Sequence, residues 1–264
     1  MTLATNLAAV EAPPSPGPKY FDFPAIPGLE AVGATKPMVL AVVSVPLIFF
    51  VLQRMSAPAA VVPGRAQFAG EMVYDFVKGI VRDNIGGDAY RKYVPYLFAT
   101  FLFILVNNVY GVIPFLQFPT MSRFGFPVGL ALLAWTVYNV AGIRQHGVLG
   151  YLKHQTVPTG VGGPILAIMV PVEFFSNILV RPFTLALRLF ATMFAGHLLI
   201  ILFSLGAEYL IFFSDNPLYI PAGVLSFVAG LVITFLDMLI MFLQAYVFTL
   251  LTAMYIGTAI AEEH

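Results

Sequence analysis

The sequence predicts an all-α polytopic membrane protein with about five membrane helices, including a long tilted hairpin, plus an interfacial amphipathic helix. Of its 264 residues, 59% are hydrophobic and 10% are charged, whereas about 25% of the residues in an ordinary soluble domain are charged. Several apolar runs reach the roughly 20 residues that a membrane-spanning helix needs. A soluble protein of this composition would expose large apolar patches, so contact with lipid explains the composition better.

Composition also argues against several functional classes. The net charge of +0 gives no basic surface for a nucleic acid, so we expect no nucleic-acid partner. The chain has no cysteine, which excludes disulfides and thiolate metal sites. The sequence shows no nucleophile–base constellation, phosphate loop or metal cluster. We therefore expect no cofactor, no metal site and no catalytic site within this chain.

The chain divides into an N-terminal segment and a membrane domain. Residues 1–36 are rich in proline and alanine and are expected to form an irregular extramembrane segment. They lack the basic region and long apolar core of a cleavable signal peptide. Residues 37–264 are expected to form a single membrane domain, whose first apolar run would both target the chain and stay in the membrane.

Three apolar runs of ordinary length predict the first three spans, at about residues 37–54, 93–115 and 126–143. Pro46 lies inside the first run. Proline is tolerated in a membrane helix where neighbouring helices satisfy the freed backbone groups. These three runs are therefore expected to be simple spanning helices.

Residues 63–83 have a different pattern. Glu71, Asp75, Lys78 and Arg82 follow the spacing i, i+4, i+7, i+11, so they share one face of a helix, and the apolar residues lie mostly elsewhere. This pattern indicates an amphipathic helix on the membrane surface or against a partner. An ordinary helix in an extramembrane loop is the alternative.

Two apolar stretches, at about residues 163–205 and 222–261, are much longer than a single span. At 1.5 Å per residue, ~40 residues form ~60 Å of helix, about twice the thickness of the hydrocarbon core. Each stretch could be two short helices or one long, strongly tilted helix. The first has no Gly-Pro break after Pro182 and the second has no proline after Pro221. We therefore expect two long tilted helices joined by a turn around residues 214–217.

Basic residues predict the orientation. The loops after the first and third spans are basic, and the opposite loops hold Arg123 and little else. The positive-inside rule places the basic loops in the cytoplasm, the N-terminus outside and the C-terminus in the cytoplasm. The basic residues of these loops are Arg54, Arg65, Lys78, Arg82, Arg91, Lys92, Arg144 and Lys153.

Five ionisable residues lie within the two long stretches: Glu173, Arg181, Arg188, His197 and Asp237. A charged side chain at the bilayer centre costs at least ~2.5 kcal/mol on insertion scales, and such residues usually face a bundle interior or a water-filled cavity. A buried ion pair that holds helices together is the alternative for any one of them. Five such residues on one hairpin favour a polar pathway.

Arg188 is the sharpest case among these residues. It lies too far from the outer end of its helix for snorkelling to bring its head to water, and it stays charged. Asp237 is one candidate counter-charge, because it lies about 15 residues into the returning helix and is expected at a similar depth. A carboxylate on another subunit is the other. The first arrangement is a static clip, and the second makes Arg188 part of a device that works with another subunit.

Small residues favour a partner for this helix. Ala186, Ala191, Ala195 and Gly196 narrow the helix near Arg188. Small residues allow another helix to approach closely in a membrane. An arginine needs such an approach if it is to reach a carboxylate on a neighbouring subunit.

Other polar residues share these helices. Gln244 lies one heptad beyond Asp237 on the same face, and Thr192 lies one turn after Arg188. Asn108, with the adjacent Asn107, interrupts the second span. Each of these alone is more often a hydrogen bond between helices than a functional group. His197 could relay protons near neutral pH, although a lone histidine is more often simply hydrogen-bonded.

Several of these runs resemble segments of a known family. Residues 181–199, RPFTLALRLFATMFAGHLL, resemble the signature helix of the a subunit of F-type ATP synthases. Residues 236–264, LDMLIMFLQAYVFTLLTAMYIGTAIAEEH, resemble the last helix of that family. VNNVYGVIP (106–114) and GYLKH (150–154) are similar to family segments in matching order, so the resemblance spans roughly residue 36 to the end.

The resemblance implies a place in a larger machine. In the family, the two long tilted helices curve against a rotating ring of c subunits. Two aqueous half-channels reach the middle of the membrane from opposite sides, and protons pass between them on the ring carboxylates. The implied partners are the c-subunit ring, the b-subunit stator, other ATP synthase subunits and membrane lipid. The implied location is the bacterial plasma (inner) membrane.

The resemblance also implies roles for individual residues. Arg188 would separate the half-channels and meet each ring carboxylate, and Gln244 would face the ring near it. His197 and Asp237 fall on two positions where relatives often carry Glu and His, so the residue types are exchanged here. Asn108 matches an asparagine of the second span.

Two positions depart from the family pattern. Glu173 resembles a glutamate near a half-channel, with a spacing to Pro182 that is one residue longer than in the family. Thr192 occupies a position usually held by Asn, which weakens the case that an amide is required there. The sequence has no sodium-specific signature, so the proton is the default ion.

Two other functions remain open from the sequence. An ion-coupled secondary transporter would use a similar buried charged pair, but it predicts inverted repeats and helices broken at the midplane. The sequence shows no such internal symmetry. A purely structural membrane scaffold would pair Arg188 with Asp237 as a salt bridge.

Overall fold

The computed structural model describes residues 35–56, 64–113, 116, 118–156, 165–213 and 217–261. The expected irregular segment up to residue 34, the turn at 214–216 and the last three residues lie outside the described residues. Within the described ranges the regular structure is helical and no strand occurs. Five helical stretches there are long and apolar enough to cross a membrane, which confirms the all-α polytopic membrane fold. They are Lys36–Met55, Tyr90–Val109, Gly125–Lys153, Met169–Phe213 and Ile220–Ile260.

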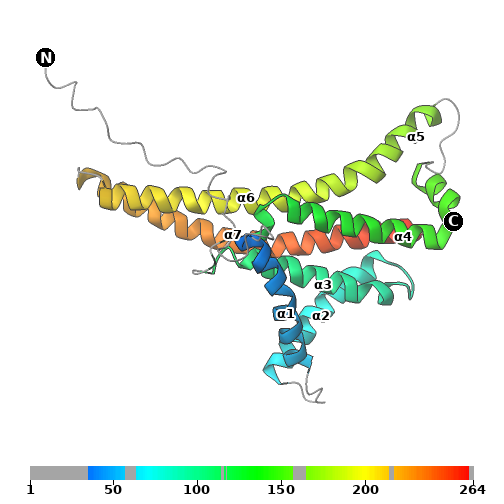
Figure 1. The fold of residues 1–264 in the computed structure, drawn as a ribbon, viewed down its shortest axis with the longest axis horizontal. Coiled ribbons are helices and arrows are strands. Elements are labelled where there is room, and N and C mark those ends of the chain that lie inside the picture. The colour runs from blue at the N-terminus through cyan, green and yellow to red at the C-terminus, as the bar shows by residue number, and fades with distance from the viewer. Residues whose placement is uncertain are drawn as a thin grey trace.

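Helix α1 (Lys36–Ser56) leads away from the rest of the molecule, with α2 (Arg65–Asn84) beside it (Figure 1). Large apolar side chains such as Val42, Phe49 and Phe50 are exposed along α1. In the first half of α1, Ser44 Oγ accepts a buried hydrogen bond of 2.9 Å from the amide Nδ2 of Asn107. This bond fixes α1 to α3 (Tyr90–Val109) and leaves the other faces of α1 for lipid or partners.

Helix α2 is amphipathic, as the charge spacing indicates. Asp75 and Arg82 are exposed, whereas Val77 and Val81 are fully buried. Its Phe76 ring lies about 6 Å from rings on two other helices, at 6.1 Å from Phe101 of α3 and 5.8 Å from Tyr246 of α7. Part of the apolar side of α2 therefore packs on the protein itself, whereas Phe68 and Met72 are exposed.

Helix α4 (Gly125–Thr156) follows the short 3-10 turn η3 (Thr120–Ser122) and is kinked at Gly147. Gly147 has φ 72° and ψ 168°, a backbone conformation that is essentially restricted to glycine. The last turns of α4 fold back there, and the ring of Tyr151 occupies the space over Gly142 that a Cβ would need. The kink brings polar residues of this end toward the following helices.

The long hairpin begins with α5 (Ile165–Phe175), the π-helical segment η4 (Ser176–Val180) and α6 (Arg181–Glu208). A second π segment, η5 (Tyr209–Phe213), ends this arm, and η6 (Pro217–Tyr219) leads into the 41-residue α7 (Ile220–Ile260). The first arm is thus one continuous helical stretch rather than two separate helices. Figure 1 shows it bending near the junction of α5 and α6.

Helix α7 forms the centre of the fold. Figure 1 shows α6 running alongside its first part, and α4 and α3 on either side of its second part. The apolar side chains that meet there are fully buried, which fixes the position of α7 against three helices. They include Leu97, Phe101, Ile104, Leu185, Leu189, Met193, Met241, Phe248 and Ile256.

Candidate functional site

Arg188 lies on an exposed face of α6. Thr184, Ala191 and Ala195 are exposed on the same face, whereas Leu185 and Leu189 are buried in the hairpin. Among the described residues, Arg188 forms no ion pair. The sequence predicts a buried arginine, but this chain does not provide that burial. The charge is presented to whatever packs on the outer face of the hairpin.

The small residues near Arg188 divide between two faces. Ala191 and Ala195 are exposed beside Arg188, and they flatten the outer face. Ala186 is buried inside the molecule, and Gly196 faces α7. Only part of the expected small-residue surface is therefore available to an external partner.

The antiparallel register of α6 and α7 is set by contacts along the whole hairpin. Ser226 Oγ donates a 3.0 Å hydrogen bond to the carbonyl of Phe203. The Asp237 carboxylate lies against Gly196. Further along, the Arg181 guanidinium lies 5.1 Å from the centroid of the Tyr255 ring. These contacts place Arg188 within about one helical turn of Gln244 along the hairpin.

This register corrects the expected depth of Asp237. The sequence predicts that Asp237 lies at the depth of Arg188. Instead, it lies against Gly196, eight residues or about 12 Å of helix beyond Arg188. The first arm of the hairpin continues to Phe213, about eight residues beyond its expected end at 205, so Arg188 lies farther from the end of its arm than Asp237 does. The position excludes the simple salt bridge that a structural scaffold would need.

Asp237 and Gln244 form part of a buried polar group at the interface of α7 with α6 and α3. Asp237 is only 2% exposed, and neither carboxylate oxygen has a hydrogen-bond donor among the described residues. Gln244 is buried, and its Nε2 also lacks an acceptor there. His197, one residue beyond Gly196, is buried too, with the Phe118 ring packed edge-on against it at 6.2 Å.

Asn108 adds an amide to this region from the end of α3. It is fully buried, and its side-chain oxygen and nitrogen both lack partners in the described part of the chain. Met241, one turn beyond Asp237, packs directly over Gly111, three residues after Asn108. The structure thus buries Asn108, His197, Asp237 and Gln244 in the part of the molecule where α3, α6 and α7 meet.

Thr192 does not join this polar group. Its hydroxyl donates a 2.8 Å hydrogen bond to the backbone carbonyl of Arg188, one turn earlier in the same helix. A threonine that bonds back to its own helix offers no free donor to a neighbour. Thr192 therefore shapes the helix beside Arg188 rather than extending the polar group.

Along the hairpin, Glu173 lies on the other side of Arg188 from His197. It belongs to a second polar group. Asn177 Nδ2 donates to the Glu173 carboxylate at 3.3 Å and to the backbone carbonyl of Gln155 at 2.7 Å. Gln155 Nε2 in turn donates to Tyr151 Oη at 3.0 Å. The part of α4 that folds back after Gly147 thus supplies a hydrogen-bond acceptor to Asn177, which in turn donates to Glu173.

The π-helical segment 176–180 lies between Glu173 and Pro182. A π turn accommodates one additional residue within an α-helix, so this segment sets the face on which Glu173 lies relative to α6. Carbonyls of this segment accept bonds from α4: Trp135 Nε1 donates to Ile178 at 2.9 Å and Tyr138 Oη to Asn177 at 3.3 Å. The additional residue does not interrupt the helical arm, and the two hydrogen bonds from α4 fix the position of the π-helical segment.

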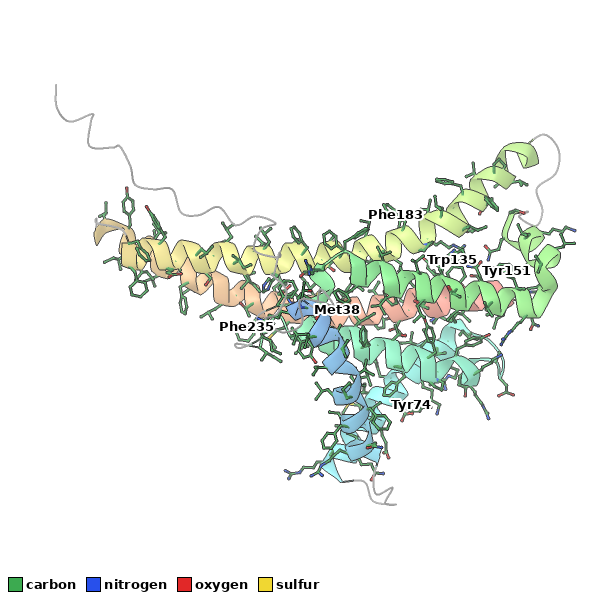
Figure 2. The ribbon with its side chains drawn as sticks, viewed as in Figure 1. Met38, Tyr74, Trp135, Tyr151, Phe183 and Phe235 are labelled. Carbon is green, nitrogen blue, oxygen red and sulfur yellow. The ribbon has the colours of Figure 1, made fainter. Side chains whose placement is uncertain are left out.

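Figure 2 shows Trp135 and Tyr151 between α4 and the bent α5–α6 arm, whereas Phe183 points away from the bundle. Sequence reasoning missed Asn177 and its contacts. The signal was present, because an asparagine four residues after a glutamate in an apolar helix shares its face. The contribution of α4 had no such signal, since it depends on the kink at Gly147.

Comparison with known proteins shows which family this chain resembles. The family model described as ATP synthase A chain matches residues 37–257. The "ATP synthase subunit a" of Nocardioides sp. is 52% identical over 259 residues, covering 94% of each chain. The protein of the same description from Paenarthrobacter aurescens is 48% identical, again over 94% of each chain.

A more distant relative extends the match. The "ATP synthase subunit a" of Streptomyces lividans is 39% identical over 255 residues, covering 95% of this chain and 89% of that protein. These similarities do not favour the secondary transporter. The bacterial relatives and the apolar helices together indicate a multi-pass membrane protein. By sequence along nearly its whole length, the chain belongs to the ATP synthase A chain family.

Proposed function

We propose that this chain translocates protons through two aqueous half-channels beside a ring of c subunits, and that Arg188 separates the two. The observation that carries the proposal is the exposure of Arg188 on the outer face of α6, without an ion pair among the described residues. A charge in an apolar membrane helix requires a compensating group. A carboxylate on the ring is the group that fits.

The first half-channel runs through the polar group of Asn108, His197 and Asp237. Buried polar atoms without a protein partner are usually satisfied by water in folded proteins. The two oxygens of Asp237 and the amide of Asn108 are such atoms. A hydrated path here would let Asp237 and His197 exchange protons with the ring, whereas Gln244, which the resemblance places facing the ring, is buried within this chain.

The second half-channel runs along the polar group of Glu173 and Asn177, on the other side of Arg188. Glu173 is 15 residues before Arg188, or about 22 Å along an α-helix, and His197 is nine residues after it, or about 14 Å. The two polar groups therefore lie at different depths. Thr192 belongs to neither, and we assign it to shaping the helix next to Arg188.

Arg188 makes this arrangement work as a coupled device. Its fixed positive charge opposes a continuous proton path between the two groups, because a cation in a low-dielectric site strongly disfavours a second one nearby. A proton must then cross on a ring carboxylate, which turns the ring. Each proton releases about 2.3 kcal/mol per 100 mV of membrane potential.

The assembly follows from the same proposal. The c ring meets the outer face of α6, and the b-subunit stator and other subunits hold the chain against it. The distribution of Lys and Arg supports an N-terminus outside and a C-terminus in the cytoplasm. The location is the bacterial plasma membrane.

The substitution Arg188→Ala tests the proposal. Proton-driven ATP synthesis in membrane vesicles is expected to be abolished, while the amount of assembled complex stays measurable by immunoblot. Thr184→Ala, on the same exposed face, is the matched control and should retain synthesis. Normal coupled synthesis by the Arg188→Ala complex would refute the assignment.

A further inference from the structure

A cleft between one end of α3 and the facing end of α4 lies outside both polar groups. The chain runs up α3 and back down α4, so the start of α3 and the region before the kink in α4 lie at the same end of the fold. The cleft has a volume of about 300 Å³. It is lined by Lys92, Tyr93, Thr136, Val137, Val140, Ala141 and Arg144.

The charge of this cleft is positive, and no described residue neutralises it by an ion pair. Lys92 and Arg144 are both exposed at its rim, and no acidic residue lines it. Neither cation forms an ion pair with any described residue. The neighbouring Arg91 differs, because its guanidinium lies 3.2 Å from the carboxylate of Asp88.

Tyr93 lies near both cations. Lys92 Nζ lies 5.9 Å from the centroid of the Tyr93 ring, and Tyr93 and Arg144 line the same cleft. Tyrosine and basic side chains gather at the level of lipid headgroups, where an aromatic ring can contact both polar and apolar material. The rim of the cleft therefore has the composition of a headgroup region.

The wall of the cleft is apolar. Val137, Val140 and Ala141 form it from α4, a helix that is long and apolar enough to cross a membrane. A small soluble anion would contact only the rim. An amphiphile with an anionic head and a hydrocarbon chain would contact both the cations and the valine wall.

We propose that this cleft binds an anionic phospholipid, with the phosphate between Lys92 and Arg144 and an acyl chain along Val137 and Val140. Basic pockets between membrane helices bind anionic headgroups because opposite charges attract there at reduced dielectric. The apolar wall selects a lipid over free phosphate. The proposal does not depend on how protons cross the membrane.

The test uses the whole ATP synthase complex in nanodiscs that contain a photoreactive phosphatidylglycerol at low mole fraction. Crosslinked peptides from α3 and α4 are identified by mass spectrometry. The double substitution Lys92→Gln with Arg144→Gln should weaken labelling about thirtyfold, which corresponds to about 1 kcal/mol for each cation. The control Arg91→Gln, at the paired neighbour, should label normally.

A second variant and a competitor separate the possible ligands. Val140→Trp fills the wall without changing charge, so it should also abolish labelling if an acyl chain lies there. Added sodium phosphate should not reduce the labelling when the ionic strength is held equal in all samples. Equal labelling by photoreactive phosphatidylcholine, displacement by phosphate, crosslinking of another subunit in the cleft, or unchanged labelling of the double variant would each overturn the proposal.

Discussion

The carboxylate of Asp237 lies directly over Gly196, in the space that the Cβ of any other residue would occupy. This contact joins the two arms of the hairpin next to His197. It also places the acid at a level different from Arg188. The packing of α6 on α7 thus requires a glycine at position 196. This glycine faces α7, so it does not contribute to the surface that a partner would contact.

The substitution Gly196→Ala is expected to displace the Asp237 carboxylate. The added Cβ would overlap the carboxylate, which must turn away from its place next to His197, so proton-driven ATP synthesis should fall severalfold. Gly230→Ala is the control, because its added Cβ would meet Phe203 at 3.4 Å, an ordinary contact distance. Synthesis rates in vesicles, normalised to assembled complex, measure both variants. A Gly196→Ala complex as active as the control would contradict this reading.

Exchanging the two charges should not restore function. The double variant Arg188→Asp with Asp237→Arg is expected to be as inactive as Arg188→Asp alone, because the two residues lie about 12 Å apart along the hairpin and form no ion pair. ATP synthesis compared across the single and double variants measures any coupling. Recovery in the double variant would support the static clip.

Asn177→Leu should weaken the second polar group. The leucine keeps the approximate shape but removes the donor to Glu173 and to the Gln155 carbonyl. A lost hydrogen bond to a charged group costs about 1.5–3 kcal/mol, so ATP-driven proton pumping should fall about tenfold or more. Fluorescence quenching in inverted vesicles follows the pumping. Thr184→Val, whose hydroxyl only bonds back to its own helix, should pump normally, and equal rates in both variants would rule out a role for Asn177.

Gly147→Ala should destabilise the fold-back of α4. An alanine at φ 72° and ψ 168° is strained by about 1–3 kcal/mol, and the bonds of Tyr151 and Gln155 depend on this kink. Limited proteolysis of the assembled complex should cleave residues 148–156 faster. Gly129→Ala, in the same helix with open space around its Cβ, should not change the cleavage rate. Equal cleavage of the two variants would mean that the kink tolerates a side chain.

The sequence predicted the helices well, because long apolar runs have few other structures available in a membrane. Arg188 and Asp237 stood out for the same reason, since a charge in such a run is costly. The facing direction of Ala186 and Gly196 could not be predicted. Both lipid and protein surfaces of a membrane helix are apolar, so periodicity does not separate the inner face from the outer one.

The register of the hairpin and the second polar group were also beyond sequence reasoning. Asp237 lies at the level of Gly196 because the first arm of the hairpin continues through the π-helical segment to Phe213, beyond its expected end at 205. The bonds from Trp135 and Tyr138 to the π-helical segment exist because that segment turns carbonyls toward α4. The donors, Trp135 and Tyr138, are far from this segment in the sequence. Neither differs from other aromatic residues of an apolar helix when the sequence alone is considered.

The face of α6 that holds Arg188 is expected to meet the ring. The chain has no cysteine, so an introduced one is unique in this subunit. Ala191→Cys and Ala195→Cys, beside Arg188 on the exposed face, should each form a disulfide with a cysteine scanned along the outer helix of the c subunit. Ala186→Cys, which is buried, should not. Crosslinks from Ala195→Cys without crosslinks from Ala186→Cys are the predicted result. Crosslinking from Ala186→Cys alone, or from none of the three in an assembled complex, would contradict the account.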